Sequence, residues 1–310
     1  MRIVFLGSGA FGLPTVRALH AEHDLVLVVS QPDRPAGRRR VLTPTPVSAW
    51  AEQNGLPLMR PDDVNDPPIV RAIHGERPDA IVIIAYGQKL GTDLLDGMFA
   101  VNLHGSLLPQ FRGAAPINRA MMSGATETGV SVITLAQRMD AGAVLAERAT
   151  PIDPHETAGE LHDRLAELGP EVVLEVLLQH ARGTLHPEPQ DEALATRAPK
   201  LTKADGTTSF DRAAAAVRAR VHGLVPWPGC SVRLGDGTLR LLRVQVVDEA
   251  PMPDAPPGTL HADGTVTCQP GRIRLLEVQP PGGRAMAFSA FIRGHAWHPA
   301  ARLEPIDTQA

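Results

Sequence analysis

Three continuous apolar runs constrain the fold of this chain more than any other feature. They span residues 2–6, 25–30 and 80–85, and the third reads AIVIIA. Runs of this kind form strands of a parallel sheet that is covered on both faces. Helical patterns lie between them at 47–54 and 69–74, and two more strands are expected at 128–135 and 144–149. Strands that alternate with helices predict a doubly wound, mostly parallel α/β sheet.

The second half of the chain has a different pattern. Residues 156–182 read as one long amphipathic helix, and residues 186–200 are rich in proline and charge. From residue 230 onward, short alternating runs are separated by Gly, Pro and Asp, which is typical of a small antiparallel barrel. We therefore expect a Rossmann-like domain at 1–185, a linker at 186–203 and an OB-like β-barrel domain at 204–310, with a helix near 212–222.

An amide and an imidazole stand two residues apart at the end of another apolar run. Asn102 and His104 follow residues 98–101, and on a strand they point to the same face. Leu107, Leu108 and Pro109 then form a short apolar wall, and polar groups beside an apolar slot are the usual composition of a ligand site. An Asn-x-His pair by itself is also compatible with a strand end that carries a surface histidine.

Asp140 is the candidate for a third polar residue. It follows the strand expected at 128–135, where the carboxyl edge of the sheet should lie and where doubly wound folds bind ligands. A carboxylate near His104 favours the imidazolium form. Asn102 and a protonated His104 could then donate to an oxyanion while Asp140 accepts or relays a proton. The Asp-x-Gly pattern is equally common in simple turns.

Residues 7–12 have the Gly-x-Gly-x-x-Gly spacing of a dinucleotide-binding turn. That motif also requires an acidic residue at the end of the second strand, where this chain reads VSQP. We interpret the glycines as a tight strand-to-helix turn and expect no NAD. The two cysteines have no metal-ligand spacing and form no disulfide framework, so no metal and a reducing, cytoplasmic compartment are expected. No run of 18 apolar residues occurs, so no membrane segment is expected.

Charge is distributed unevenly along the chain. The net charge of −4 argues against a nucleic-acid partner, but residues 197–310 hold 14 basic and 10 acidic residues, whereas residues 1–196 hold 16 and 24. The C-terminal part, with a balance of +4, can therefore accept a polyanion. Two basic groups are candidates for phosphate contacts, although a charge run of this size is usually just solvated. They are Arg38, Arg39 and Arg40, and Lys200 and Lys203.

The stretch VNLHGSLLPQFRGAAP at residues 101–116 resembles the signature of 10-formyltetrahydrofolate-dependent formyltransferases, above all those that act on methionyl-tRNA. The resemblance extends over nearly the whole chain. It implies that Asn102, His104 and Asp140 form the catalytic set. It also implies a binding surface for the co-substrate 10-formyltetrahydrofolate, made of Ser106, Leu107, Leu108, Pro109, Tyr86, Gly87 and Gln88. Three places depart from the family pattern: GSGAF at 7–11, where the family has Gly-Thr-Pro and an acidic residue, LAQR at 135–138, where it has Met-Asp-x-Gly, and MDAG at 139–142.

The expected function is formyl transfer to the α-amino group of initiator methionyl-tRNA, with the basic residues at 38–40, 200 and 203 against the tRNA. We expect a cytoplasmic monomer, although sequence does not determine the oligomeric state. Two alternatives are a formyltransferase for a small amine, such as a sugar nucleotide or purine precursor, and a dinucleotide- or RNA-binding module without catalysis. The second domain favours the tRNA, because a small amine needs no extra barrel to dock. The intact catalytic set disfavours the non-catalytic module.

Overall fold

The computed structural model describes residues 1–37, 40–251, 255–294 and 301–306, and the chain divides into two compact units. The first comprises Met1–Arg112, Gly129–Ala149 and His162–Arg197, and the second comprises Gly113–Thr128, Thr150–Leu161 and Ala198–Ala310. The chain thus enters the second unit at three places. The domain boundaries predicted from the sequence, 1–185 and 204–310, stay a prediction.

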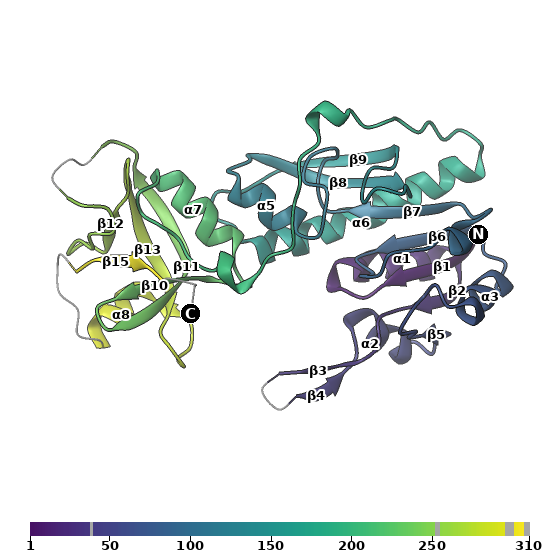
Figure 1. Cartoon of the computed structure of the whole chain (residues 1–310), viewed down its shortest axis with the longest axis horizontal. Helices are drawn as coiled ribbons and strands as arrows, with labels where there is room; N and C mark the ends of the chain where they lie inside the picture. Colours follow the sequence, from purple (N-terminus) through teal and green to yellow (C-terminus); the bar gives the residue numbers. More distant parts are fainter. Residues whose placement is uncertain (38–39, 252–254, 295–300, 307–310) are drawn as a thin grey trace. The chain divides into compact units, whose positions relative to one another are not determined.

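Seven strands form the sheet of the first unit, in the order β5-β2-β1-β6-β7-β8-β9 (Figure 1). The pairs β1–β2, β1–β6, β2–β5 and β6–β7 are parallel, and β7–β8 is antiparallel. The strand order reverses direction between β1 and β6, as in a doubly wound sheet, so the predicted fold class is confirmed. The strands are β1 (Arg2–Gly7), β2 (Asp24–Val29), β5 (Leu58–Met59), β6 (Ala80–Ile84), β7 (Ala100–His104), β8 (Glu127–Thr134) and β9 (Val144–Pro151).

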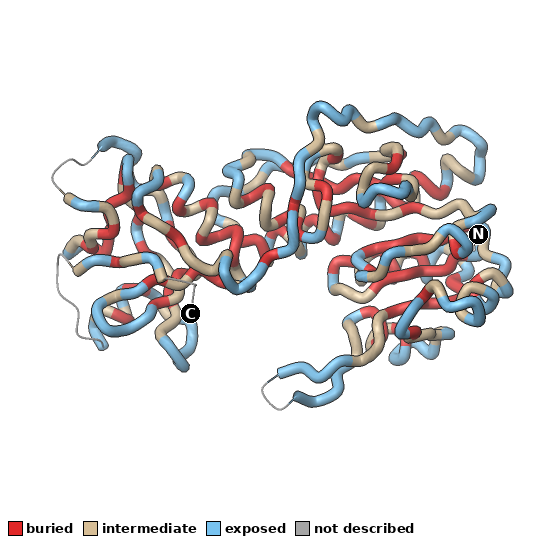
Figure 2. Tube along the Cα trace, viewed as in Figure 1, coloured by how far each residue is buried: buried red, intermediate tan, exposed pale blue. Residues whose placement is uncertain are grey.

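The sheet is covered on both faces, as its apolar runs predict. Every residue of β6 is buried (Figure 2). On one face, side chains of β1 and β6 pack with Ile73 and Leu94, from α3 and α4. On the other, Phe5 and Ile84 lie against Gly12 at the start of α1. The helices of this unit are η1 (Ala10–Gly12), α1 (Leu13–Glu22), α2 (Pro46–Gln53), α3 (Pro67–Gly75), α4 (Thr92–Leu95), η2 (Glu192–Leu194) and α6 (Ala158–Ala181), whose first residues belong to the second unit.

The glycine-rich turn after β1 is built for close packing. A Cβ on Gly7 would stand 2.4 Å from the Phe5 ring and 3.0 Å from the Ile84 carbonyl. The Ser8 hydroxyl donates to the Tyr86 carbonyl and accepts from the Gln31 N–H, at 3.1 Å each. The glycines therefore serve a tight strand-to-helix turn, and the one polar side chain among them ties together three loops at the carboxyl edge of the sheet.

The second unit contains an antiparallel sheet in the order β12-β13-β11-β10-β15, with β14 beside β13. Backbone bonds of residues 258–260 join Ala301 and Leu303 on one side and Thr267 on the other, so the sheet closes into the predicted barrel. Val217 and Val221 of α7 pack into its core. The elements are α5 (Pro116–Met122), η3 (Lys203–Asp205), α7 (Ala214–Gly223), β10 (Cys230–Leu234), β11 (Gly237–Asp248), β12 (Thr265–Thr267), β13 (Arg272–Gln279), β14 (Met286–Ala287), α8 (Phe288–Gly294) and β15 (Leu303–Pro305).

An exposed two-stranded ribbon is formed by the residues before and after Arg38 and Arg39, which lie outside the described residues. Strands β3 (Arg34–Ala36) and β4 (Val41–Thr43) pair antiparallel, and all six of their residues are exposed. The sequence did not predict this ribbon, because proline and glycine give little strand signal. In the part of the chain that the structure describes, no helix combines the length and apolarity needed to cross a membrane.

Candidate active site

Strand β7 delivers Asn102 and His104 to the same face of the sheet. Asn102 pairs with Ile83 of β6 and Ile133 of β8, and His104 pairs with Ser131. Leu103, between them, is buried on the opposite face. The His104 ring is buried, whereas Asn102 is partly exposed, and its side-chain amide makes no hydrogen bond to any residue that the structure describes. Asn102 can therefore donate to a substrate.

The two ring nitrogens of His104 face different partners. Nε2 lies 3.0 Å from the Phe111 carbonyl oxygen. Because a carbonyl can only accept, Nε2 carries a proton and donates to it. Nδ1 lies 3.6 Å from Asp140 Oδ2, which is ion-pair distance but longer than a hydrogen bond. Nδ1 is thus the nitrogen left for chemistry, and it faces the carboxylate.

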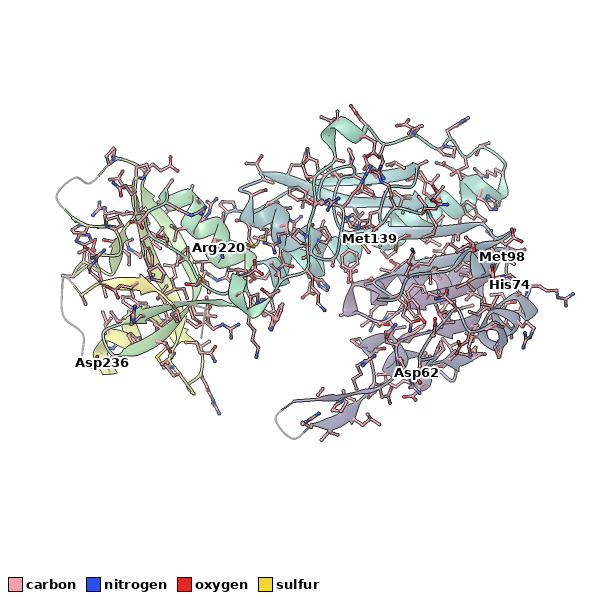
Figure 3. All side chains as sticks on the ribbon, in the orientation of Figure 1. Asp62, His74, Met98, Met139, Arg220 and Asp236 are labelled. Carbon is pink, nitrogen blue, oxygen red and sulfur yellow. The ribbon has the colours of Figure 1, made fainter. Side chains whose placement is uncertain are left out.

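The turn that carries Asp140 requires a glycine at position 142. A Cβ on Gly142 would lie 1.7 Å from the Thr134 carbonyl oxygen, at the end of β8. Asp140 itself has a left-handed backbone with φ 54°, a conformation that costs about 1–3 kcal/mol and often occurs at functional sites. Its neighbour Met139, labelled in Figure 3, is 72% exposed, so the turn lies at the surface. The Asp-x-Gly pattern therefore forms a turn and also brings Asp140 to His104.

The stretch predicted to bind folate is only partly open. Ser106 and Leu108 are buried, and Leu107 and Pro109 are partly exposed. The Ser106 hydroxyl donates to the Gln110 carbonyl at 2.7 Å, and the Leu108 N–H donates to Ser131 Oγ at 3.0 Å. Leu107 and Pro109 are thus the side chains that this stretch can offer to a ligand.

The second predicted folate segment offers backbone rather than side chains. Tyr86 is 2% exposed, and burial raises the pKa of its phenol to about 12. The Gln88 side chain accepts from the Val64 N–H at 2.8 Å and donates to the Asp62 carbonyl at 3.1 Å. Gly87, between them, is exposed with φ 92°. A folate contact here stays a prediction, and it would have to involve the backbone around Gly87.

Sequence reasoning missed the residue that ties the Asp140 turn to the rest of the site. Gln190 donates from Nε2 to the carbonyls of Asp140 and Gly142, at 2.8 and 2.7 Å. Its Oε1 accepts from the buried guanidinium of Arg112 at 2.7 and 2.9 Å. Glu192 lies two residues after Gln190. Hydrogen bonds, the larger contribution from Arg112 and the smaller from Arg138, lower the pKa of its carboxyl to about 2. Gln190 lies in the segment predicted as a linker, and no motif marks it.

The basic residues predicted to contact tRNA have different settings. Arg38 and Arg39 lie outside the described residues. Arg40 is exposed with φ 49° at the tip of the ribbon. Lys200 and Lys203 are exposed, and neither has an ion-pair partner among the residues that the structure describes. Their role in binding stays a prediction.

Comparison with known proteins places this geometry in context. A family model described as formyl transferase matches residues 1–177, and one described as formyl transferase, C-terminal domain, matches residues 200–296. A protein of Methylococcus capsulatus named methionyl-tRNA formyltransferase is 42% identical over 302 residues, 96% of this chain and 97% of that protein.

Two solved structures are similar in fold. HypX from Aquifex aeolicus in complex with tetrahydrofolic acid has a TM-score of 0.62 at 18% identity, over 96% of this chain and 49% of that one. An N-formyltransferase from Helicobacter canadensis, bound to folinic acid and dTDP-3-aminofucose, has a TM-score of 0.66 at 11% identity, over 88% of this chain and 98% of that one. Identities this low show a shared fold and nothing further.

Proposed function

This chain belongs to the formyl transferase family, and we infer that it transfers a formyl group to the α-amino group of methionyl-tRNA. The observation that carries this inference is the extent of the similarity to the Methylococcus capsulatus protein of that name. It includes 96% of this chain at 42% identity, so it spans both the sheet and the barrel. A likeness confined to the sheet would support formyl transfer without indicating the acceptor.

For the formyl donor we propose 10-formyltetrahydrofolate. Membership in the formyl transferase family supports a folate donor, and a protein of the same fold was solved in complex with tetrahydrofolic acid. Within this chain, Leu107 and Pro109 follow His104 by three and five residues and are partly exposed, so they can offer apolar surface to the ligand. Exposed backbone at Gly87 follows β6, where the strand order reverses and ligands bind in such sheets. Folate has the matching chemistry, a flat ring with a polar edge.

The proposed chemistry assigns one task to each residue of the catalytic set. As the amine nitrogen bonds to the formyl carbon, the formyl oxygen gains negative charge, and the Asn102 amide and protonated His104 Nδ1 donate to it. Asp140 accepts the proton that the amine loses. When the bond from the formyl carbon to the folate nitrogen breaks, that nitrogen takes up the proton held by Asp140, the carboxylate is restored and the oxygen becomes a carbonyl again. His104 Nδ1 and Asp140 Oδ2 lie 3.6 Å apart, so both can reach a formyl group and an amine that bind next to them.

The acceptor is large, and we propose that the basic side chains hold its phosphates. Arg40 lies at the tip of an exposed ribbon, and Lys200 and Lys203 are exposed. Contacts of this kind set position but do not read sequence. We also propose a cytoplasmic monomer, in keeping with a tRNA substrate and with two buried free cysteines.

The small-amine alternative is not favoured. Its support is the fold shared with an N-formyltransferase bound to an amino-sugar nucleotide, at 11% identity. The relative with full-length similarity is named for methionyl-tRNA. Membership in an enzyme family likewise argues against a binding module without catalysis.

One assay tests the proposal. Release of tetrahydrofolate from 10-formyltetrahydrofolate is followed with methionyl-tRNA, uncharged tRNA or an amino-sugar nucleotide as acceptor. We expect turnover only when methionyl-tRNA is the acceptor. The Asp140→Asn variant should turn over about a hundredfold more slowly, the usual scale for losing a catalytic proton acceptor. Turnover with the amino sugar and none with methionyl-tRNA would reject the proposed acceptor.

A further inference from the structure

We propose that residues 188–197, here called the strap, hold the catalytic set in register, with Gln190 and Thr196 as positioning residues. The proposal rests on the proposed function, because it concerns the same reaction. The strap lies between the stretches that the two family models match, residues 1–177 and 200–296. It was predicted to be a linker, yet in the structure it is bound along the first unit.

The first point of attachment is the Asp140 turn. Gln190 donates both hydrogens of its side-chain amide to the carbonyls that flank this turn, Asp140 and Gly142. Its oxygen is held by the guanidinium of Arg112, which is 9% exposed. The amide therefore has no freedom to rotate: turned over, it would set its oxygen against two carbonyls and its NH₂ against a cation. The two hydrogen bonds from Gln190 therefore fix the position of the backbone turn that carries the Asp140 carboxylate.

The second point of attachment lies behind His104. Thr196 Oγ1 accepts from the Phe111 N–H at 2.8 Å, and the Thr196 carbonyl accepts from the Arg112 N–H at 2.9 Å. Phe111 has a left-handed backbone with φ 61°, and its carbonyl is the acceptor for His104 Nε2. Thr196 thus secures a strained residue whose carbonyl fixes the tautomer and the tilt of the His104 ring.

The ends of the strap are anchored as well. Glu188 exchanges two backbone hydrogen bonds with Val144, at 2.8 Å each, and Arg197 forms a parallel bridge with Arg112. Glu192, between the two positioning residues, pairs with Arg112 and Arg138 at the surface. One segment therefore supports both sides of the 3.6 Å gap between His104 and Asp140. Because a misplacement of about 1 Å can cost a hundredfold in rate, this support matters for turnover.

The test separates positioning from general stability. Gln190→Glu keeps an oxygen for Arg112 but sets a second oxygen against the carbonyls of the Asp140 turn. We expect kcat to fall about 10- to 100-fold, with little change in KM for either substrate and an unchanged melting temperature. Glu188→Gln is the matched control, since its exposed side chain lies in the same strap and only its backbone bonds the first unit, and it should retain kcat within about twofold. Gln190→Met, which loses both ends, serves as a second variant.

A double-mutant cycle then asks whether Gln190 acts through Asp140. If it does, Gln190→Glu should lower kcat in the native background but hardly further in Asp140→Asn. Thr196→Val should behave in the same way toward His104→Ala. Equal losses of kcat in both backgrounds would overturn the proposal, as would failure of both Gln190 variants to fold, which would make the contact purely structural. An inactive native protein would instead reject the proposed function, so the two failures are distinguishable.

Discussion

Protonation of His222 should make the second unit lose stability as the pH falls. His222, on α7, is 1% exposed, and its Nε2 accepts from the Val244 N–H at 3.1 Å. The folded protein thus holds the ring neutral, with its proton on Nδ1. Burial lowers the pKa of His222 from 6.5 to about 4, aided by the charges of Arg243 and Arg218 and opposed by Glu160.

The sign follows from where the proton binds. The unfolded chain takes up a proton below pH 6.5, whereas the folded protein resists doing so until about pH 4. The unfolded state therefore binds more protons between these values, and the free energy of unfolding falls by up to about 1.4 kcal/mol per pH unit. The loss attributable to His222 is about 2 kcal/mol at pH 5 and about 3 kcal/mol at pH 4, relative to pH 7.5.

The variant His222→Gln isolates this effect. Glutamine can place an oxygen near the position of Nε2 to accept from the Val244 N–H, but it does not titrate. Urea unfolding of both proteins at pH 7.5 and pH 5 gives four free energies of unfolding. The native chain should lose about 2 kcal/mol more than the variant over this interval. Equal losses would refute the reasoning and assign the acid sensitivity to other groups.

Three further predictions concern the site. Asn102→Ala and His104→Ala should each lower kcat about a hundredfold or more, and Asp140→Asn about as much with folate binding largely kept; near-normal turnover of a folded Asp140→Asn would remove Asp140 from the mechanism. Gly142→Ala should lower both turnover and melting temperature, because its Cβ would lie 1.7 Å from a carbonyl oxygen, and a native melting curve would contradict this. Replacing the arginines at 38–40 by alanine should raise KM for methionyl-tRNA and flatten its salt dependence without affecting folate binding; an unchanged KM across low and moderate salt would mean that the loop is merely solvated.

The sheet could be predicted because its signal is local. An apolar run such as residues 80–84 is buried at every position in the structure, and its short length and β-branched residues favour a covered strand from the sequence alone. The side-chain alternation along a strand likewise placed Asn102 and His104 on one face. Approach of Asp140 to His104 followed from topology, since the carboxyl edge of a doubly wound sheet gathers the ends of its strands.

Local patterns say less about which side chains remain free. Tyr86 and Gln88 were expected at a ligand, yet the ring of Tyr86 is buried and the Gln88 amide is bonded to the loop at 61–64. Both residues lie at the correct edge of the sheet. A motif match cannot distinguish a side chain that contacts the ligand from one that shapes the loop around it, because both roles can require the same residue type.

The strap shows a further limit, and it suggests a rule. Its contacts join residues far apart in the chain: Gln190 bonds Gly142, Asp140 and Arg112 across 48, 50 and 78 positions. No periodicity encodes such contacts, so the segment reads as a linker. Yet an extended segment that packs against a fold cannot satisfy its own backbone N–H and C=O groups, as a helix does. Such a segment must borrow hydrogen-bond partners from the elements beside it. In this chain two of those elements are the Phe111 backbone, which holds the His104 ring, and the turn that carries Asp140. The strap, which shows no sequence pattern, is therefore attached to both sides of the catalytic set.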